Sequence, residues 1–505
     1  MQRRIKPNVK HHRPGTKHTN KVNKKLIIRL IGTLLIFESI AFAVCLVVSL
    51  YYKDSGITAF IISTAVTLLA GIMLRRAGRN AKTSLTRYDS FAVVTLSWLS
   101  CTIMGMLPYL LSGGLSTVTD AFFEVMSGLT STGATVIDNL DSLPQGLHFW
   151  RCMTNWIGGM GIVVFTLALL PSNSVGEIKL FSAEMTGPKS SKLHPRFKTT
   201  TRWLLSTYFL LTICCIASLY LAGMNLFDSI CHAFATTGTG GFSTRSASIA
   251  YYNSPAIEYI ITLFMFLSGM NFTMLYSLFF RRKFKIFFTN SEIKAYIFIT
   301  LAAAAGISVS LYFHSGYDVP TAIRQALFHV VSIETTTGFL SANIMGWMPI
   351  TWIILSIVMF NGACAGSTSG GLKVVRIVAL FKITVNEFKY ILHPRAVIPV
   401  RINNSTMNYS MEHTLLSFAT LYVFFIIVGT IALCITGVPL MDATGISLTS
   451  ISNTGPEIGA AYGALPSWSV IPETAKWISS LLMFIGRLEI FTVIILFVPR
   501  FWKDY

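Results

Sequence analysis

Long apolar runs alternate with short polar linkers along the whole 505-residue chain. Ten of these runs have about 20 residues or more, the length that an α-helix needs to cross a bilayer. The pattern therefore predicts an all-α integral membrane protein with ten spans. Their expected ranges are 26–50, 57–75, 89–112, 149–171, 203–223, 255–280, 293–313, 349–380, 412–436 and 474–499.

A second pattern recurs four times between the later runs. Each copy begins with a polar residue, continues through a short apolar helix and reaches a glycine thirteen positions later. The polar residues are Asp120, Asp228, Gln325 and Asp442, and the glycines are Gly133, Gly241, Gly338 and Gly455. Such regular recurrence indicates a repeat. We interpret the chain as four helix, loop, helix repeats preceded by two extra spans.

The segments that end at these glycines, called the glycine loops below, have the chemistry of a cation site. Glycine permits unusual dihedrals, and non-helical backbone at membrane depth must line a cavity or be buried in protein. Four such segments around one axis would form a carbonyl cage for a dehydrated cation. The alternative is that the four segments are unrelated turns that join helices. The thirteen-residue offset, which every copy shares, argues against this alternative. The candidate ion-binding residues are Ser131, Thr132, Gly133, Thr239, Gly240, Gly241, Thr336, Thr337, Gly338, Asn453, Thr454 and Gly455.

Composition supports a membrane protein. Hydrophobic residues make up 53% of the chain and charged residues 12%, against about a quarter charged in soluble domains. A net charge of +19 would suggest nucleic acid as the partner of a soluble protein. Most of the lysines and arginines lie in linkers, however, where they are a topology signal, so we expect no nucleic-acid partner. The basic linkers are 1–29, 75–87, 179–202, 281–294, 373–401 and 500–503.

The remaining linkers contain the glycine loops and most of the acidic residues. Basic segments stay on the cytoplasmic side of a membrane, which predicts cytoplasmic termini and glycine loops near the outer surface. Residues 1–25 are basic and almost free of apolar side chains, so we expect a disordered cytoplasmic tail. The acidic linkers carry Asp120, Glu124, Asp138, Asp141, Asp228, Asp318, Asp442, Glu457 and Glu473.

Cysteine and histidine residues suggest no further chemistry. None of the eight cysteines forms a C-x-x-C pair, and nearly all lie in or beside apolar runs. They are therefore expected to be small buried hydrophobes, with neither a disulfide framework nor a metal site. No cluster of acids or histidines lies at one membrane face, so we expect no enzymatic activity.

The eighth span contains an interruption, called the intramembrane loop below. Gly366, Gly370 and Gly371 make a continuous helix expensive, at about 1 kcal/mol each relative to alanine. A nucleotide-binding loop is the alternative, but Leu372 intrudes before Lys373 and no Ser or Thr follows. The loop comprises Gly362, Ala363, Cys364, Ala365, Gly366, Ser367, Thr368, Ser369, Gly370 and Gly371.

Two charged residues are expected at membrane depth. Arg487 lies about 18 Å from the cytoplasmic end of its span, at 1.5 Å per residue. We expect it to face the pore and contact the intramembrane loop. An interhelical salt bridge is the alternative, although Glu489, two positions on, is a poor partner. Glu334, four residues before Gly338, is expected either to act at the filter, by bracing its loop or attracting cations, or to reach the outer vestibule.

Five motifs accompany these features: NWIGGMG at 155–161, GFST at 241–244, TTTGF at 335–339, GSTSGGLK at 366–373 and GRLEIF at 486–491. With them the chain resembles the Trk/Ktr/HKT superfamily of cation transporters, specifically its TrkH/TrkG branch. The resemblance covers roughly residues 26–502. The implied division is a tail (1–25), two extra helices (26–88) and four pore repeats (89–175, 176–285, 286–400 and 401–505).

The resemblance implies a single-chain pseudo-tetramer in which each glycine loop replaces one TVGYG filter strand. It implies potassium uptake across a bacterial inner membrane, with potassium as substrate and no cofactor. A sodium-permeable or poorly selective channel is the alternative. Ala134 and Pro456 replace an aromatic residue that would buttress the filter, so fewer well-defined ion sites are expected.

The resemblance also implies roles and partners. The intramembrane loop would be a gate under the filter, with Arg487 helping to hold it shut. Members of the family form homodimers and are controlled by a cytosolic nucleotide-binding ring of the TrkA type. Residues 1–505 show no such domain, so the regulator would be a separate protein.

Overall fold

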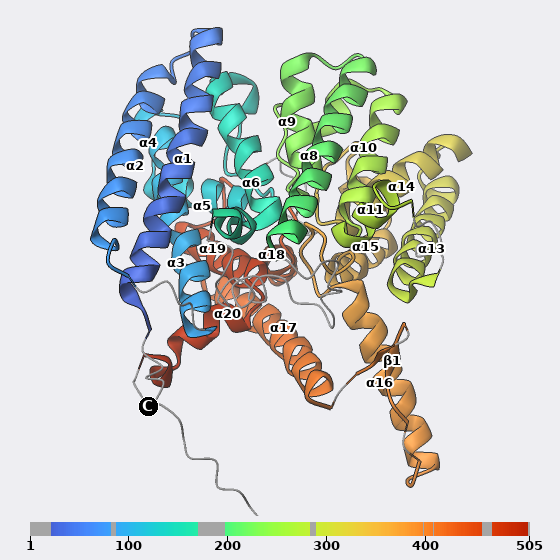
Figure 1. Ribbon diagram of the computed structural model, residues 1–505. Helices are drawn as coiled ribbons and strands as arrows, with labels where there is room; N and C mark the ends of the chain where they lie inside the picture. Colours follow the sequence, from blue (N-terminus) through green and yellow to red (C-terminus); the bar gives the residue numbers. More distant parts are fainter. Residues whose placement is uncertain are drawn as a thin grey trace, which may run out of the picture.

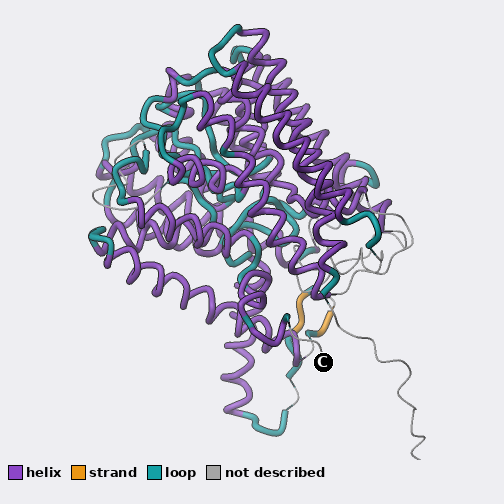
Figure 2. Tube along the Cα trace, turned by 90° about the vertical axis from the view of Figure 1, so that its left-hand side faces the viewer, coloured by secondary structure: helices purple, strands orange, loops and turns teal. Residues whose placement is uncertain are grey.

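The computed structural model describes residues 22–81, 87–169, 197–282, 289–396, 398–403, 405–407, 409–456 and 467–502. In these ranges the protein is helical except for one small antiparallel pair, β1 (Arg401–Ile402) and β2 (Ser405–Thr406). Figure 1 shows the helices gathered in one bundle, from which α16 (Val374–Leu392) projects. The two strands lie at the same end of the molecule as the C-terminus (Figure 2).

Two N-terminal helices precede the repeats, as predicted. α1 (Lys24–Tyr52) and α2 (Ile57–Ala77) lie side by side at one edge of the bundle (Figure 1). A Cβ atom added to Gly32 would lie 2.7 Å from the carbonyl oxygen of Gly71. The glycines therefore let the two backbones approach closely. The expected disordered tail lies outside the described residues, apart from its last residues, where α1 begins.

Each repeat contributes an outer helix, a short loop helix before the glycine loop, and an inner helix after it. The first has α3 (Arg87–Gly105), α4 (Leu107–Ser112), α5 (Val118–Leu129), η1 (Leu140–Ser142) and α6 (Gln145–Leu169). The second has α8 (Phe197–Leu221), α9 (Leu226–Thr237), η2 (Ser248–Tyr252), α10 (Pro255–Ser268) and α11 (Phe272–Phe279).

The third and fourth repeats follow the same order. The third has α13 (Ser291–His314), α14 (Val319–Glu334), η3 (Ile344–Gly346), α15 (Pro349–Asn361) and α16. The fourth has α17 (Tyr409–Ile435), α18 (Leu440–Ser452), α19 (Glu473–Arg487), α20 (Phe491–Ile494), η4 (Ile495–Phe497) and η5 (Pro499–Phe501). The loop helices are α5, α9, α14 and α18.

The recurring polar residue has a local role in starting the loop helices. Thr117 caps α5 by accepting the backbone N–H of Asp120, and its hydroxyl donates to the Asp120 carboxylate at 2.7 Å. Asn225 caps α9 in the same way through Asp228. An acid in the first turn also interacts favourably with the helix dipole. In the first two repeats the polar residue of the sequence pattern is thus part of a helix start, whereas Gln325 lies within α14.

The inner helices differ most from the predicted spans. Six expected spans are continuous helices, and two more are pairs bent by 107° (α10 and α11) and 106° (α19 and Phe491–Phe497). α6 is kinked at Gly161, where φ is 74°, and α15 ends at Asn361 before the intramembrane loop. Only this last interruption was predicted. The break at Gly161 was missed although Gly158 and Gly159 lie beside it, and the bends near Gly269 and Gly486 were missed because each is a single glycine, which apolar helices tolerate.

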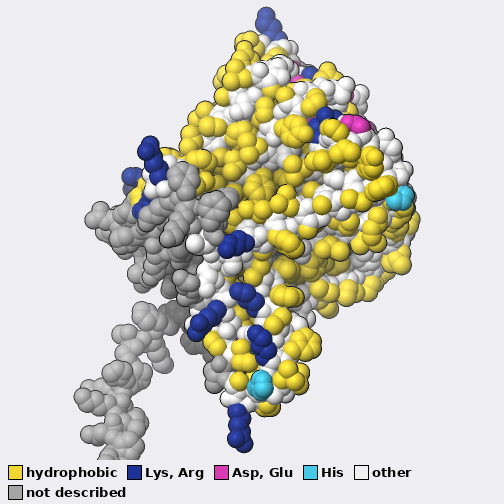
Figure 3. Space-filling view, turned by 90° about the vertical axis from the view of Figure 1, so that its right-hand side faces the viewer, with side chains coloured by type: hydrophobic (Ala, Val, Ile, Leu, Met, Phe, Trp, Pro, Cys, Tyr) yellow, Lys and Arg dark blue, Asp and Glu magenta, His cyan; other side chains and the backbone are white. Residues whose placement is uncertain are grey.

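The surface of the bundle matches a lipid environment. Figure 3 shows hydrophobic side chains covering most of one face, with Lys and Arg gathered on the projection formed by α16. On α13, Phe298 is 71% exposed and Leu301 is 59% exposed. Apolar exposure on this scale marks a membrane contact surface. The fold is that of a multi-span membrane protein, as the hydrophobic pattern predicted.

Candidate functional site

The four glycine loops meet in a closed ring. A Cβ atom added to Gly133 or to Gly241 would lie 1.9 Å from a carbonyl oxygen of the next loop in sequence. One on Gly338 would lie 2.9 Å from the backbone nitrogen of Gly455, and one on Gly455 would lie 3.0 Å from the carbonyl oxygen of Gly133. The contacts thus run from the first loop to the fourth and back to the first. Four segments distant in sequence therefore surround one axis, packed so closely that a side chain does not fit.

The backbone of the loops has a shared conformation. The residue two positions before the glycine is left-handed in all four, with φ of 52° at Ser131, 51° at Thr239, 57° at Thr336 and 57° at Asn453. Left-handed backbone costs roughly 1–2 kcal/mol at a non-glycine residue, and backbone strain of this kind concentrates at functional sites. Three of the glycines are also left-handed, with φ of 85° at Gly133, 70° at Gly241 and 82° at Gly338.

Hydroxyl groups six positions before the glycine hold the loops in three repeats. Each donates to the carbonyl that follows the glycine, at 2.6 Å from Ser127, 2.7 Å from Ser332 and 3.4 Å from Thr449. Ala235 takes this position in the second repeat. The same register in three copies ties each loop helix to the end of its own glycine loop.

The polar residue thirteen positions before the glycine makes a second such tie in two repeats. The Asp228 carboxylate accepts the hydroxyl of Thr244 at 2.6 Å. The Gln325 amide oxygen accepts the hydroxyl of Ser341, also at 2.6 Å. Thr244 and Ser341 both lie three positions after their glycine. Together with the helix starts of the first two repeats, this long-range contact gives the polar residue a structural role in the first three repeats.

A hollow of about 370 Å³ opens above the ring and is lined by all four glycines. Arg245 also lines this hollow. Its guanidinium lies 3.2 Å from the Asp228 carboxylate and 3.6 Å from that of Asp141. The hollow therefore contains a positive charge that acids of the first and second repeats balance.

The segment after the first glycine loop contacts the fourth repeat. The hydroxyls of Ser467 and Ser469 donate to the Asp138 carboxylate, and these bonds hold the pKa of Asp138 below its ordinary value. The backbone N–H of Trp468 donates to the carbonyl of Thr135 at 2.7 Å. These contacts join the first and last repeats beside the hollow.

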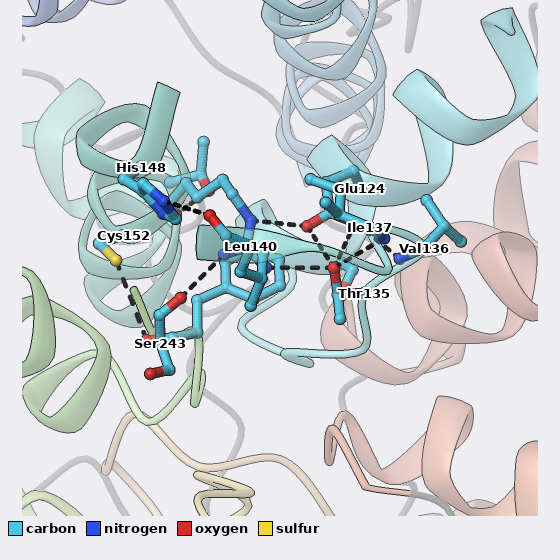
Figure 4. A network of polar contacts seen from close by, with 12 residues as sticks. Glu124, Thr135, Val136, Ile137, Leu140, His148, Cys152 and Ser243 are labelled. Atoms are coloured by element: carbon cyan, nitrogen blue, oxygen red, sulfur yellow. Dashed lines mark hydrogen bonds and ion pairs between the residues drawn. The ribbon is translucent and has the colours of Figure 1, made fainter. Parts of the chain in front are cut away.

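A buried ion pair lies behind the first and second glycine loops (Figure 4). Arg151 of α6 donates from Nε to Glu124 of α5 at 2.8 Å, and both side chains are almost wholly buried. Sequence analysis counted Glu124 only among the outer acids and did not consider Arg151. The sequence could have identified Arg151, because it is a charged residue within an apolar run. In a membrane protein such a residue is by default a candidate functional residue.

The intramembrane loop lies against the inner ends of three repeats. The N–H of Gly370 donates to the hydroxyl of Thr336 at 2.8 Å, and the N–H of Gly371 donates to the carbonyl of Ser452 at 3.0 Å. The Thr368 hydroxyl donates to the carbonyl of Thr237, at the end of α9, at 3.2 Å. A Cβ atom added to Gly370 would lie 2.0 Å from the Ser452 carbonyl oxygen. The loop is thus packed directly beneath the glycine loops.

Side chains from neighbouring helices hold the intramembrane loop in place. The Glu292 carboxylate of α13 accepts the N–H of Ala365 at 2.5 Å, and the Asn271 amide donates to the carbonyl of the same residue at 2.6 Å. The Lys373 ammonium group donates to the carbonyl of Ser369. Glu292 and Asn271 were not identified from the sequence, because their partners lie far along the chain.

Arg487 contacts the intramembrane loop, as sequence analysis expected. Its guanidinium donates to the carbonyl of Thr368 in the intramembrane loop at 2.7 Å and to the carbonyl of Gly159 in α6 at 3.1 Å. It therefore joins the intramembrane loop to the first repeat. Glu489 forms its ion pair with Arg376 of α16 instead, as expected of a poor partner for Arg487.

Glu334 is fully buried at the end of α14. Its carboxylate accepts the hydroxyl of Thr300 in α13 at 2.5 Å. The alternative in which this acid reaches the outer vestibule is therefore wrong, because its carboxylate is buried against α13. The contact supports the alternative of a bracing role, in which Glu334 fixes the loop helix to α13.

Comparison with known proteins assigns the chain to a family. Residues 56–504 match the TrkH family, described as a cation transport protein. Over 483 residues the chain is 39% identical to the Trk system potassium uptake protein TrkH of Escherichia coli K12, covering 95% of this chain and 99% of that protein. It is 33% identical to the Trk system potassium uptake protein TrkG of the same strain over 487 residues, covering 96% of this chain and 100% of that protein.

Structural comparison agrees with the sequence match. The crystal structure of the potassium transporter TrkH from Vibrio parahaemolyticus is similar to this chain, with a TM-score of 0.86 and 35% identity. The similarity covers 95% of this chain and 99% of that one. The four-repeat helical architecture, the ring of glycine loops and these matches together place the chain in the TrkH family of cation transport proteins.

Proposed function

We propose that this protein is the membrane subunit of a bacterial Trk system and takes up potassium through the ring of glycine loops. The closed cycle of glycine contacts carries the proposal, because it brings four backbone segments around one axis. Carbonyl oxygens in such a ring can replace the hydration shell of a potassium ion. The relatives named above as potassium uptake proteins support this choice of ion.

The ion-binding segments in this proposal are 131–133, 239–241, 336–338 and 453–455. The fourth differs from the others, because Gly455 lacks the left-handed φ of the other three glycines and precedes Pro456. Its carbonyls are therefore not equivalent to those of the other loops. This asymmetry favours the second candidate function, a sodium-permeable or weakly selective cation pathway, and gives it a structural basis.

The intramembrane loop is the gate in this proposal. It is packed under the glycine loops through Gly370 and Gly371, and Arg487 ties it to α6. A path from the ring to the cytoplasm would cross this loop. Its backbone has left-handed φ at Gly362, Gly366 and Gly371, so it is not a rigid helix. Alternative positions of the loop then lie close in free energy.

The proposed protein has its termini in the cytoplasm, forms a homodimer and is regulated by a cytosolic nucleotide-binding subunit of the TrkA type. The start of α1, the projecting α16 and the C-terminal helices lie at one end of the bundle (Figure 1). Basic residues gather on α16 (Figure 3), which supports placing this end in the cytoplasm. The other docking segment expected from the sequence, 179–202, lies almost entirely outside the described residues.

Growth at low potassium tests the proposed function. A bacterium without its own potassium uptake systems, but with a TrkA-type subunit, is supplied with this gene or an empty vector. The gene should restore growth on potassium alone, and cells should accumulate rubidium as a tracer. Growth rescued equally by raised sodium would favour the weakly selective alternative. Absence of rescue by correctly inserted protein would contradict potassium uptake.

A further inference from the structure

We infer that Glu124 and Arg151 form a brace that positions the first and second glycine loops and so contributes to ion selectivity. The inference rests on the proposed function, in which these loops bind the ion. Neither side chain belongs to the ring itself. Both act through the backbone segments that leave the two loops, which makes them positioning residues.

The position of Glu124 is used in the same way in other repeats. It lies nine residues before its glycine, and the corresponding residues are His232, His329 and Ile446. The His232 ring lies 3.0 Å from the hydroxyl of Ser243, and the His329 ring accepts the N–H of Ser341 at 3.4 Å. In three of the four loop helices, this position therefore contacts the segment two or three residues beyond the glycine.

The first repeat alone uses a carboxylate at this position, and it makes more contacts than either histidine. Glu124 accepts the hydroxyl of Thr135 at 2.9 Å and the N–H of Val136 at 2.9 Å. Thr135 lies two residues after Gly133. The carboxylate therefore holds the backbone immediately beyond the ring. A buried carboxylate requires a charged partner, because an uncompensated charge is expensive to bury.

Arg151 supplies that partner and extends the brace to the second repeat. While Nε pairs with Glu124, Nη1 donates to the carbonyl of Ser243 at 3.0 Å and Nη2 donates to the hydroxyl of Thr135 at 3.2 Å. The guanidinium also lies over the ring of Phe242, 4.1 Å from its centre. One side chain thus connects the segments that leave two adjacent glycine loops.

The brace should affect selectivity because the residues that it contacts lie close in sequence to the glycines of the ring. Phe242 and Ser243 are one and two residues after Gly241, and Thr135 is two after Gly133. A close-packed interior transmits small displacements. Loss of the brace should therefore shift the carbonyls of two loops relative to the other two, which changes how well the ring discriminates between ions of different size.

The experiment compares three variants with one control. Glu124→Gln removes the charge but keeps an acceptor. Arg151→Lys keeps the charge but lacks the planar fork that reaches Ser243. Thr135→Val removes only the shared hydroxyl and introduces no buried charge. The control, Lys476→Gln, breaks the ion pair to Asp120 on the same loop helix, 2.7 Å between Nζ and Oδ1, and leaves the hydrogen bonds at Thr135, Val136 and Ser243 in place.

Sodium inhibition of rubidium uptake is the measurement, together with the KM and maximal rate for rubidium. We expect Glu124→Gln and Arg151→Lys to lower the preference for rubidium over sodium roughly fivefold, equivalent to about 1 kcal/mol. Thr135→Val should change it in the same direction, by about twofold, since it removes one uncharged partner of the network. Lys476→Gln should keep the parent's sodium sensitivity.

The possible outcomes distinguish failure of the proposed brace from failure of the proposed filter. Folded Thr135→Val protein with the parent's sodium sensitivity overturns the brace, even if the charge variants are not recovered. Variants that lower only the maximal rate, with unchanged sodium inhibition and KM, also overturn it, because that result indicates a purely structural pair. Gly133→Ser is measured in parallel. If this variant also leaves selectivity unchanged, the proposed filter is contradicted rather than the brace alone.

Discussion

At the scale of single residues, the ring depends on glycines, because there is no room for a side chain where the loops meet. Gly133 and Gly241 face carbonyl oxygens of neighbouring loops at distances that no Cβ atom tolerates. Both also have left-handed φ, for which glycine carries no steric cost. Conformation and space therefore both require glycine. The space requirement is the functional one, because it sets how closely the four backbones approach.

Gly133→Ser and Gly338→Ser should lower the preference for potassium over sodium. Each serine side chain would displace the facing loop, which sets the positions of the carbonyls. Rubidium uptake competed by sodium measures the effect, for which a severalfold loss is expected. Gly316→Ser is the matched control, because Gly316 has φ of 69° but no atom within 4 Å of an added Cβ. Equal sodium sensitivity in all of these proteins would count against the ring as the filter.

At the scale of elements, the inner helix of every repeat is broken at membrane depth. The breaks give each repeat irregular backbone, which must be buried or line a water-filled path. In the third repeat the break expands into the intramembrane loop. Its polar groups are paired by residues from several other elements, including Arg487 of α19 and Glu292 of α13. The loop is thus an ordered barrier that is held by side chains.

Arg487→Ala should raise basal ion flux while leaving potassium preference largely intact. The change leaves the carbonyls of Thr368 and Gly159 without this donor, so the closed position of the intramembrane loop loses stability. A deletion within residues 363–369 should act in the same direction. Flux from reconstituted vesicles is the measurement, after size-exclusion chromatography has established folding.

Arg75→Ala is the control for this comparison, because it also removes one positive charge, from α2, away from the intramembrane loop. Its basal flux should equal that of the parent. If folded Arg487→Ala protein conducts less than the parent, the intramembrane loop is a permeation or structural element and the gate assignment fails.

At the scale of the whole molecule, the repeats form one closed unit with a distinct projection at one end. Contacts around the ring return from Gly455 to Gly133, and Trp468 joins the first and fourth repeats beside the hollow. The opposite end bears α16, with exposed apolar side chains such as Phe381 and Phe388 beside basic ones. A surface of mixed apolar and basic character outside the bundle suits a protein partner.

The double variant Lys382→Glu, Lys389→Glu should weaken binding of a TrkA-type subunit severalfold. Both lysines lie on α16, and charge reversal would repel an acidic surface of the partner. Pull-down of the purified subunit, with and without nucleotide, is the measurement. Arg75→Glu, on α2, is the control and should bind like the parent. Parent protein that never captures the subunit under any nucleotide condition would contradict the proposed partner.

The sequence by itself determined the features that depend on local chemistry. Apolar runs predicted the spans, the thirteen-residue offset predicted four repeats, and clustered glycines predicted the intramembrane loop. Hydropathy and backbone freedom are properties of short segments, so they can be inferred from neighbouring residues. Even the contact of Arg487 with the intramembrane loop followed, because a buried cation needs acceptors and the interrupted span was the evident source.

Only the tertiary structure decided which distant groups meet. The closed order of the four glycine loops, the pairing of Glu124 with Arg151 and the burial of Glu334 against Thr300 each join separate elements. The kink at Gly161 and the bend after Arg487 likewise became evident only in the packed bundle. The sequence of an apolar run does not show which group a charged residue contacts or which conformation a glycine takes. The helices packed around that residue determine both.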